Sequence, residues 1–396
     1  MSILLLAAAA ALPQPEACNK ETGNFNPATL EYLRRVDTPV PPVNFKTAGY
    51  ARIVADYSVC AINDQSRFGR NYDAERRDPI RRFFMRKQVS KVLTAQVSVR
   101  PLGVNGIATL VAIGRDSGKE GENWSTDVGN RLTLLPYFRV DPNMMLQLTA
   151  NYESQRTYTS TLAHDVVDIV ERASKLITPT TPLITASNKS RFNDASTFVD
   201  TTINGLLKVD IKENLRADSP LGRDAQPPKG ATGDNPITLA RLVLYATGTN
   251  DPYQRNPSEY LRPVGMWTIK VEPFSGSLFN GVEGTDTPAV ASVLNFQVSD
   301  GKRVREMLAG DTIVSGARDA VLKPGAKKDL VGTLCRAVAS RADAEGFSTE
   351  DVNWIVAAYI ADMSPTSNPV SGLASGCPIT SIDKMYAQEK AKAKAG

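Results

Sequence analysis

Alternation of apolar and polar residues is the clearest pattern in the first three quarters of the chain. It is sharpest over residues 144–153, where apolar residues at 144, 146, 148, 150 and 152 are interleaved with polar residues at 147, 149, 151 and 153. A period of two is typical of a half-buried antiparallel strand. The turn sequence Asp141-Pro142-Asn143 separates this strand from an apolar stretch at residues 132–140. The sequence from 132 to 158 therefore predicts a β-hairpin.

Other segments have strand patterns or helical spacing of apolar residues. We predict further strands over residues 52–62, 92–99, 106–114, 197–211, 237–247, 266–274 and 291–299. We predict helices over residues 161–176, 302–309, 327–344 and 348–362. Ser348 is the expected N-cap of the last helix, with Asp351 at the capping-box position. Residues 218–236 are rich in Pro, Gly and Asp and predict a long loop.

These elements predict a mainly β, α+β fold. We expect two antiparallel β-sandwich-like domains with one intervening helix, followed by a small C-terminal helical domain. The expected ranges are 1–17 for a signal peptide, 18–48 for an extended Pro-rich segment, 49–178 for the first β domain with its closing helix, 179–300 for the second β domain, 301–385 for the helical domain and 386–396 for a charged tail.

The N-terminus predicts export. An apolar run is followed by Ala7 to Ala11, which resembles the h-region and small-residue cleavage site of a secretory signal peptide. No Lys or Arg precedes the run, and an apolar first helix is the alternative. The sequence contains no run of about 18 or more apolar residues, so it predicts no transmembrane helix. The expected location is therefore the periplasm, the cell surface or the extracellular space.

The four cysteines fit an exported chain. They are Cys18, Cys60, Cys335 and Cys377, and none forms a Cys-x-x-Cys motif. An even number of widely spaced cysteines predicts disulfides, and we favour Cys18 with Cys60 and Cys335 with Cys377. Four buried thiols in a cytosolic protein, or a lipidated Cys18, are the alternatives.

The charge of the chain is unevenly distributed. Its 46 Lys and Arg against 42 Asp and Glu give a net charge of +4. Residues 65–91 contain nine basic and three acidic residues, a sum of +6, so the remaining residues sum to −2. Phe68, Tyr72, Phe83 and Phe84 are interleaved with these arginines. Guanidinium groups pair with phosphates and carboxylates, and aromatic rings can pack or stack beside them.

Three interpretations of this basic segment (residues 65–91) remain open. Its arginines pair with acids elsewhere in the chain, or contact an anionic surface or an acidic protein partner, or bind nucleic acid. Export and the modest isoelectric point of 8.7 argue against nucleic acid. The residues expected to contact an anionic partner are Arg76, Arg77, Arg81, Arg82, Arg86 and Lys87.

The sequence predicts no catalytic residue, metal site or cofactor. A single histidine, His164, excludes centres built from several imidazoles. Asp168 lies one helical turn further on, where it could orient the imidazole as in a triad, but an exposed surface pair is the simpler interpretation. We therefore expect a non-catalytic envelope or surface protein with a binding or scaffolding role. An exported hydrolase whose site is not readable from sequence, or an oligomeric structural subunit, is the alternative.

Overall fold

The structure is a computed structural model, and it describes most of the β-strands and the C-terminal helices. The described residues are 31–36, 43–44, 49–58, 88–118, 121–128, 131–141, 144–157, 183–206, 211–222, 237–247, 261–274, 276–279, 287–299, 301–323, 328–363 and 377.

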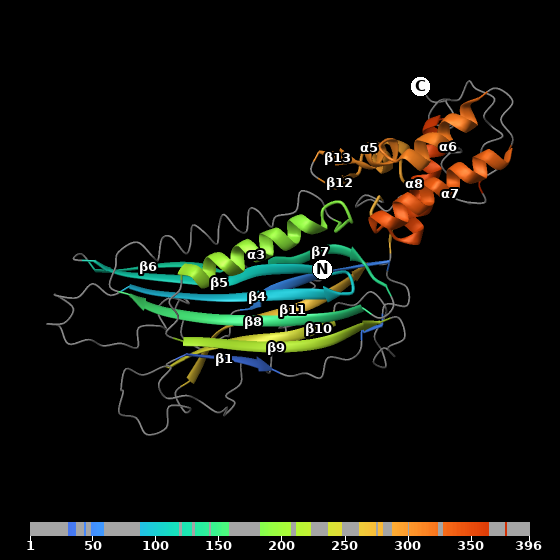
Figure 1. The fold of residues 1–396 in the computed structure, drawn as a ribbon. Coiled ribbons are helices and arrows are strands. Elements are labelled where there is room, and N and C mark those ends of the chain that lie inside the picture. The colour runs from blue at the N-terminus through green and yellow to red at the C-terminus, as the bar shows by residue number, and fades with distance from the viewer. Residues whose placement is uncertain are drawn as a thin grey trace, which may run out of the picture.

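Two β-sheets form the larger part of the molecule (Figure 1). In spatial order, sheet A contains β1 (Glu31–Val36), β10 (Ile237–Thr247), β11 (Leu261–Phe274), β3 (Tyr50–Ser58) and β7 (Arg131–Arg139). Sheet B contains β2 (Val43–Asn44), β9 (Ile211–Gly222), β8 (Met144–Thr157), β4 (Gln88–Arg100), β5 (Val104–Gly118) and β6 (Gly121–Val128). All neighbouring strands are antiparallel except β2, which runs parallel to β9.

One hydrophobic core joins the two sheets, which together we call the β body. Alternate residues of each strand enter this core, because successive side chains of a strand point to opposite faces. The fully buried Trp267 and Ile269 of β11 belong to the same cluster as Leu93 of β4 and Tyr152 of β8. Burying each such large side chain contributes about 1.5–3 kcal/mol, so the shared core is the main force holding the sheets together.

The sheets lie in close contact where β5 of sheet B meets β7 of sheet A. Gly106 of β5 lies against the backbone of β7: a Cβ atom at this position would be 2.1 Å from the carbonyl oxygen of Leu134. A contact this short is impossible for any residue with a side chain. Gly106 is therefore required by the distance between the sheets rather than by its own backbone conformation.

Helix α3 (Lys189–Leu206) lies alongside β5 (Figure 1). Its Phe192 is buried in the core that the two sheets share. The side-chain amide of Asn193 donates to the carbonyl oxygen of Gly103 at 3.0 Å, and its oxygen accepts from the backbone N–H of Asn105 at 2.9 Å. These bonds fix the helix to the turn between β4 and β5.

Five helices form a C-terminal unit, the helical lobe (Figure 1). They are α4 (Val290–Leu294), α5 (Val304–Ala309), α6 (Thr312–Leu322), α7 (Lys328–Glu345) and α8 (Thr349–Met363), with a small ladder of β12 (Gln297–Ser299) and β13 (Lys302–Arg303). From Val352 on, helix α8 is mostly apolar, and it is buried in a second hydrophobic cluster. No helix in the described part of the chain is long and apolar enough to cross a membrane.

The mixed α+β class, the antiparallel sheets and the C-terminal cluster of packed helices are confirmed. The predicted hairpin over residues 132–158 is wrong: β7 belongs to sheet A and β8 to sheet B. Each sheet also contains strands from both expected β domains, 49–178 and 179–300. In sheet A, β3 of the first range pairs with β11 of the second, and in sheet B, β8 of the first pairs with β9 of the second. The sheet pairing therefore does not separate the two β domains expected from the sequence.

Two of the predicted strands contain helices. Residues 197–206 belong to α3, and residues 290–294 form α4, which is followed by the short β12. The β-branched residues of α3 favour a strand locally, but packing of Phe192 against the sheet overrides that preference. Helix α6 was not predicted, although its N-cap Asp311 accepts from the backbone N–H groups of Ile313 and Val314 at 2.9 and 3.0 Å.

Replacing Gly106 tests the close approach of the sheets. We expect Gly106→Ala to lower the free energy of unfolding by at least about 2 kcal/mol, because the new methyl group meets fixed backbone. The matched control is Gly316→Ala in α6, where a Cβ meets open space. It should stabilise the chain by about 0.5–1 kcal/mol through helix propensity. Chemical denaturation measures both, and equal effects of the two substitutions would contradict the packing argument.

Candidate functional site

A band of polar and aromatic side chains crosses the outer face of sheet A. In β3, residues 51, 53 and 55 enter the core, so Tyr50, Arg52 and Asp56 lie on the opposite face. In β11, Phe274 is paired with Tyr50 and Glu272 with Arg52 in the register of the sheet. The band therefore runs along both strands from charged residues toward aromatic residues beneath the helical lobe.

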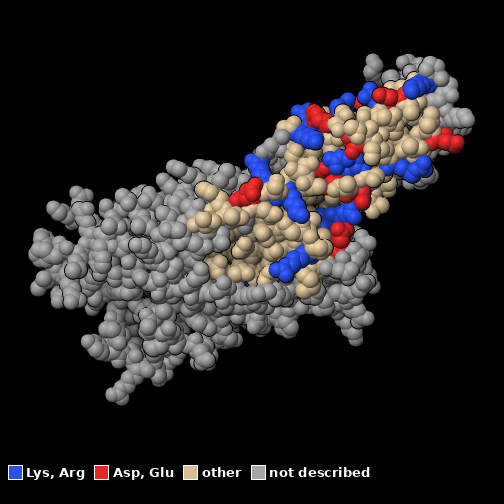
Figure 2. Space-filling view, in the orientation of Figure 1, with Lys and Arg blue, Asp and Glu red and all other residues tan. Residues whose placement is uncertain are grey.

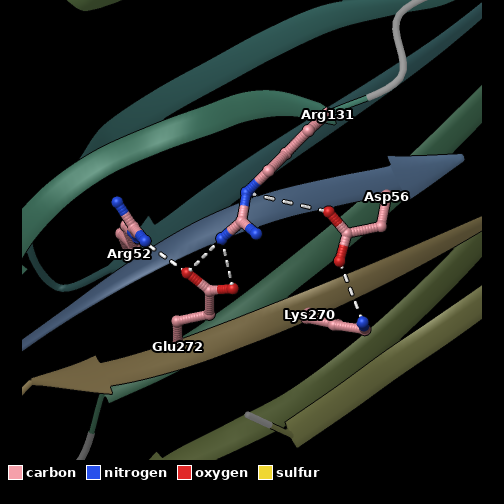
Figure 3. A network of polar contacts seen from close by, with 5 residues as sticks. All are labelled: Arg52, Asp56, Arg131, Lys270 and Glu272. Carbon is pink, nitrogen blue, oxygen red and sulfur yellow. Dashed lines mark hydrogen bonds and ion pairs between the residues drawn. The ribbon is translucent and has the colours of Figure 1, made fainter.

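The charged part of the band is a network of five residues from three strands: Arg52, Asp56, Arg131, Lys270 and Glu272 (Figure 3). Glu272 accepts from Nε of Arg52 at 2.7 Å and from Nη2 of Arg131 at 2.7 and 2.9 Å. Asp56 accepts from Nζ of Lys270 at 2.8 Å and lies 3.8 Å from Nε of Arg131. Three cations share two carboxylates, which leaves this charged network with a net charge of +1.

Aromatic rings link the charged network to the lobe. The guanidinium of Arg52 lies 5.1 Å from the centre of the Tyr137 ring, a cation–π contact. The Tyr137 ring lies 5.3 Å from that of Phe274, which lies 6.5 Å from Tyr50. All three rings pack against the hydrophobic cluster of the lobe. The outer face of sheet A is therefore polar at one end and is covered by the lobe at the other.

The band ends in a buried cluster that we call the polar junction: Tyr50, Ser277, Ser348 and Asp351. The Tyr50 hydroxyl donates to Oδ2 of Asp351 at 2.6 Å and accepts from the backbone N–H of Ser348 at 2.6 Å. Asp351 also accepts from the Ser277 hydroxyl and, at 3.2 Å, from the backbone N–H of Leu278. Three separate parts of the chain meet at one carboxyl group.

The start of α8 explains why Asp351 is in this position. The Ser348 hydroxyl accepts from the backbone N–H of Asp351 at 3.3 Å, so Ser348 is the N-cap as predicted. In a complete capping box the carboxylate would accept from the N–H of the cap residue. Here the Tyr50 hydroxyl accepts that bond instead and passes a hydrogen bond to Asp351. The hydroxyl of a β-strand residue thus completes the cap of a helix.

Burial controls the protonation of the junction. Asp351 has no exposed surface, and burial raises its pKa to about 6, although hydrogen bonds from Ser277, Tyr50 and Leu278 oppose this effect. Burial and the neighbouring Asp351 charge raise the pKa of Tyr50 far above its usual range. Tyr50 therefore stays a neutral donor at all ordinary pH values.

A second set of contacts fixes the lobe to the β body. Nη1 of Arg139, at the end of β7, donates to Oδ1 of Asp343 at 2.5 Å and to the carbonyl oxygen of Phe347 at 3.2 Å. Its Nε donates to Asp141 at 3.0 Å. The buried carboxylate of Glu345 accepts from the backbone N–H of Ser187 at 2.8 Å. On the lobe, these contacts involve the end of α7 and the loop that leads into α8.

The chemistry of the polar junction is that of a structural tie. Ser277 and Asp351 are fully buried, so a substrate cannot reach either group in this arrangement. No cluster of three metal-binding side chains occurs among the residues that the structure describes. The charged network is more accessible, since the side chain of Arg131 is 54% exposed. It is the part of the band that can contact another molecule.

Most of the site residues predicted from sequence lie outside the described ranges. These are Arg76, Arg77, Arg81, Arg82, Arg86, Lys87, Cys18, Cys60, His164 and Asp168, together with the signal peptide and the helix over 161–176. Cys335 of α7 and Cys377 are joined by a disulfide with a Cα–Cα distance of 6.0 Å. The charged network and the role of Tyr50 were not predicted; only the capping pattern at Ser348 and Asp351 pointed to this region.

No protein-family model, no curated protein and no solved structure matches the chain. Its function must therefore be argued from the residues themselves.

Removing the Tyr50 hydroxyl tests the junction. Tyr50→Phe leaves the buried N–H of Ser348 without a partner and removes one of the two bonds to Oδ2 of Asp351, so we expect a loss of about 1–3 kcal/mol in the free energy of unfolding. Tyr137→Phe is the matched control on the same face, since its hydroxyl makes no hydrogen bond in the described part of the chain. That variant should change stability by less than about 0.5 kcal/mol. Urea denaturation of the two variants distinguishes the outcomes, and equal losses would refute the bridging role.

The charged network makes a separate prediction. Glu272→Gln leaves two guanidinium groups without their shared carboxylate, whose side chain is only 15% exposed, and should cost about 1–2 kcal/mol. Asp362→Asn removes the carboxylate that pairs with Arg305 on the lobe, where both side chains are at least 38% exposed, and should cost less than about 1 kcal/mol. Unfolding measured at low and high salt checks both values. A Glu272 effect no larger than that of Asp362 would contradict cooperation within the network.

Proposed function

We propose that this chain is an exported, non-catalytic protein of a cell envelope or surface. Its role is binding or scaffolding, and it contacts an anionic partner through the basic segment, residues 65–91. In this proposal the two sheets act as a β-sandwich-like body that carries the basic segment at one end and the helical lobe at the other.

The observation that carries the proposal is the concentration of positive charge in residues 65–91. This segment sums to +6, whereas the rest of the chain sums to −2. A cluster of like charges attracts a counter-charged partner, and guanidinium groups pair well with phosphates and carboxylates. The charge distribution therefore supports contact with an external anion.

The described part of the surface supports the same assignment. On the visible face of the helical lobe, basic and acidic side chains are interspersed (Figure 2). Such a mixture produces no strong field of one sign, whereas a cluster of like charges attracts counter-charged partners. The excess positive charge of the chain is therefore concentrated in the basic segment rather than spread over the lobe.

The strands on either side of the basic segment define where it leaves the β body. Tyr50, at the start of β3, contacts the lobe, so Ser58 lies about 26 Å further along the strand. Gln88 starts β4, and the other end of β4 adjoins the turn at Gly103 that contacts Lys189, near the lobe (Figure 1). Ser58 and Gln88 therefore both lie toward the end of the β body opposite the lobe, which we call the distal end. A partner bound there would not compete with the lobe for space.

Charge reversal tests the proposal. We expect a variant with Arg76, Arg77, Arg81, Arg82 and Arg86 all changed to Glu to lose binding to sulfated-polysaccharide resin and to vesicles containing phosphatidylglycerol. The reason is that five substitutions change the local charge by −10, which turns attraction into repulsion. Binding of the wild type should weaken as salt is raised. Retention on the resin and co-sedimentation with the vesicles are the measurements.

A control with the same change in charge separates local from global effects. Arg191, Arg303, Arg318, Lys323 and Arg336 are exposed residues of α3 and the lobe, and changing them to Glu also alters the charge by −10. This control should keep more binding than the first variant. Unchanged binding after reversal of residues 76–86, or equal losses in both variants, would reject the basic segment as the contact surface.

A further inference from the structure

The polar junction has a property that its role as a tie does not require. Its central carboxyl group is fully buried, and its hydrogen bonds from described residues all come from neutral donors. Within the described residues, none of the ion pairs includes Asp351. A buried carboxylate without a cation carries a desolvation penalty that protonation removes.

The described elements packed against Asp351 bring no cation into contact with it. Strand β3 contributes Tyr50, which stays neutral. The segment 276–279 has no titratable residue, and its Ser277 and Leu278 donate to the carboxyl group. Helix α8 contributes Glu350, whose charge further raises the pKa of Asp351. At the same boundary, the guanidinium of Arg139 from β7 is paired with Asp141 and with Asp343 of α7.

The hydrogen bonds of the closed junction are also compatible with a protonated Asp351. The Ser277 hydroxyl accepts from the backbone N–H of Phe279 at 3.1 Å, and a hydroxyl has a second lone pair. A proton on Oδ1 of Asp351 can therefore be donated to Ser277, which reverses the direction of that bond. Oδ2, then a carbonyl oxygen, still accepts from Tyr50 and from the N–H of Leu278. The closed junction thus accommodates the neutral acid with its other two bonds in place.

We propose that the polar junction is a pH-sensitive joint between the helical lobe and the β body, which closes more tightly when Asp351 takes up a proton in mildly acidic solution. An open joint would expose Asp351 to water, whereas the closed joint buries it between β3, α8 and the segment 276–279. Because the joint contributes to how the lobe is held, acid would fix the lobe and neutral solution would loosen it.

The direction of the effect follows from linkage. In the closed joint the pKa of Asp351 is about 6, and in an open joint it returns to the ordinary value of about 3.9. Between these values closing takes up a proton, so the added stability of the closed joint is fully present below about pH 4 and is lost as the pH rises through about 6. With these two pKa values, the closing equilibrium should be about tenfold more favourable at pH 5 than at pH 7.5.

Hydrogen exchange tests the proposal directly. The N–H groups of Leu278 and Ser348 donate to Asp351 and to Tyr50, so their exchange reports opening of the joint. After correction for the intrinsic rate, their protection factors should rise about tenfold from about pH 7.5 to about pH 5. In Asp351→Asn this rise should disappear. Asp311→Asn, which changes a carboxylate that caps α6 elsewhere in the lobe, should keep it.

A second measurement uses the wild-type protein and therefore does not depend on whether the Asp351→Asn variant folds. The side-chain carboxyl carbon of Asp351 in the wild-type protein should titrate in NMR spectra with a midpoint near 6. A midpoint below about 4.5 would overturn the proposal, since the ordinary value for an aspartate is about 3.9. Protection that is flat or falls toward acid pH would overturn it as well, and so would a rise that Asp351→Asn retains.

Discussion

The hydrogen bond between the Tyr50 hydroxyl and Asp351 is the interaction on which the arrangement of this molecule depends. Its partners are 301 residues apart in sequence, one at the start of β3 and the other in the first turn of α8. The same hydroxyl accepts from the N–H of the N-cap residue Ser348, so helix capping and attachment of the lobe use one atom. Loss of that atom would leave the buried N–H of Ser348 without a partner and remove one bond to Asp351, which is why the contact constrains both units at once.

The outer face of sheet A consists of two parts along its length. Near the lobe, the aromatic rings of Tyr50, Tyr137 and Phe274 exclude water from the junction. Further along β3 and β11, the same face carries the charged network and stays accessible to solvent. A single alternating pattern produces both parts, because every second residue of each strand lies on this face. The boundary is the contact of Arg52 with the Tyr137 ring.

The sequence could predict the features that depend on local patterns. The alternation around residues 144–152, the run at 237–247 and the cap at Ser348 correspond to β8, β10 and the start of α8. Sheet membership could not be predicted, because the turn at 141–143 looks the same whether the chain reverses within one sheet or crosses to the other. Tyr50 has no distinguishing pattern at all: its role exists only because Asp351 is brought to it by tertiary packing. Helix α3 was mispredicted for a related reason, since contact of Phe192 with the β body outweighs the β-branched residues that follow it.

The strand order of sheet A has a consequence for how the chain acquires its structure. β3 lies between β7 and β11, and its ion pair from Arg52 to Glu272 spans 220 residues. β3 can pair with β7 early, but its other partner, β11, and the partner of β1, β10, come only after most of the β body has been synthesised. Contacts of such high sequence separation make folding slow and expose unpaired strand edges in the interval. A newly made chain therefore remains without a complete sheet A until residues up to 274 are available, and a truncation before β11 would leave β3 unpaired along one edge.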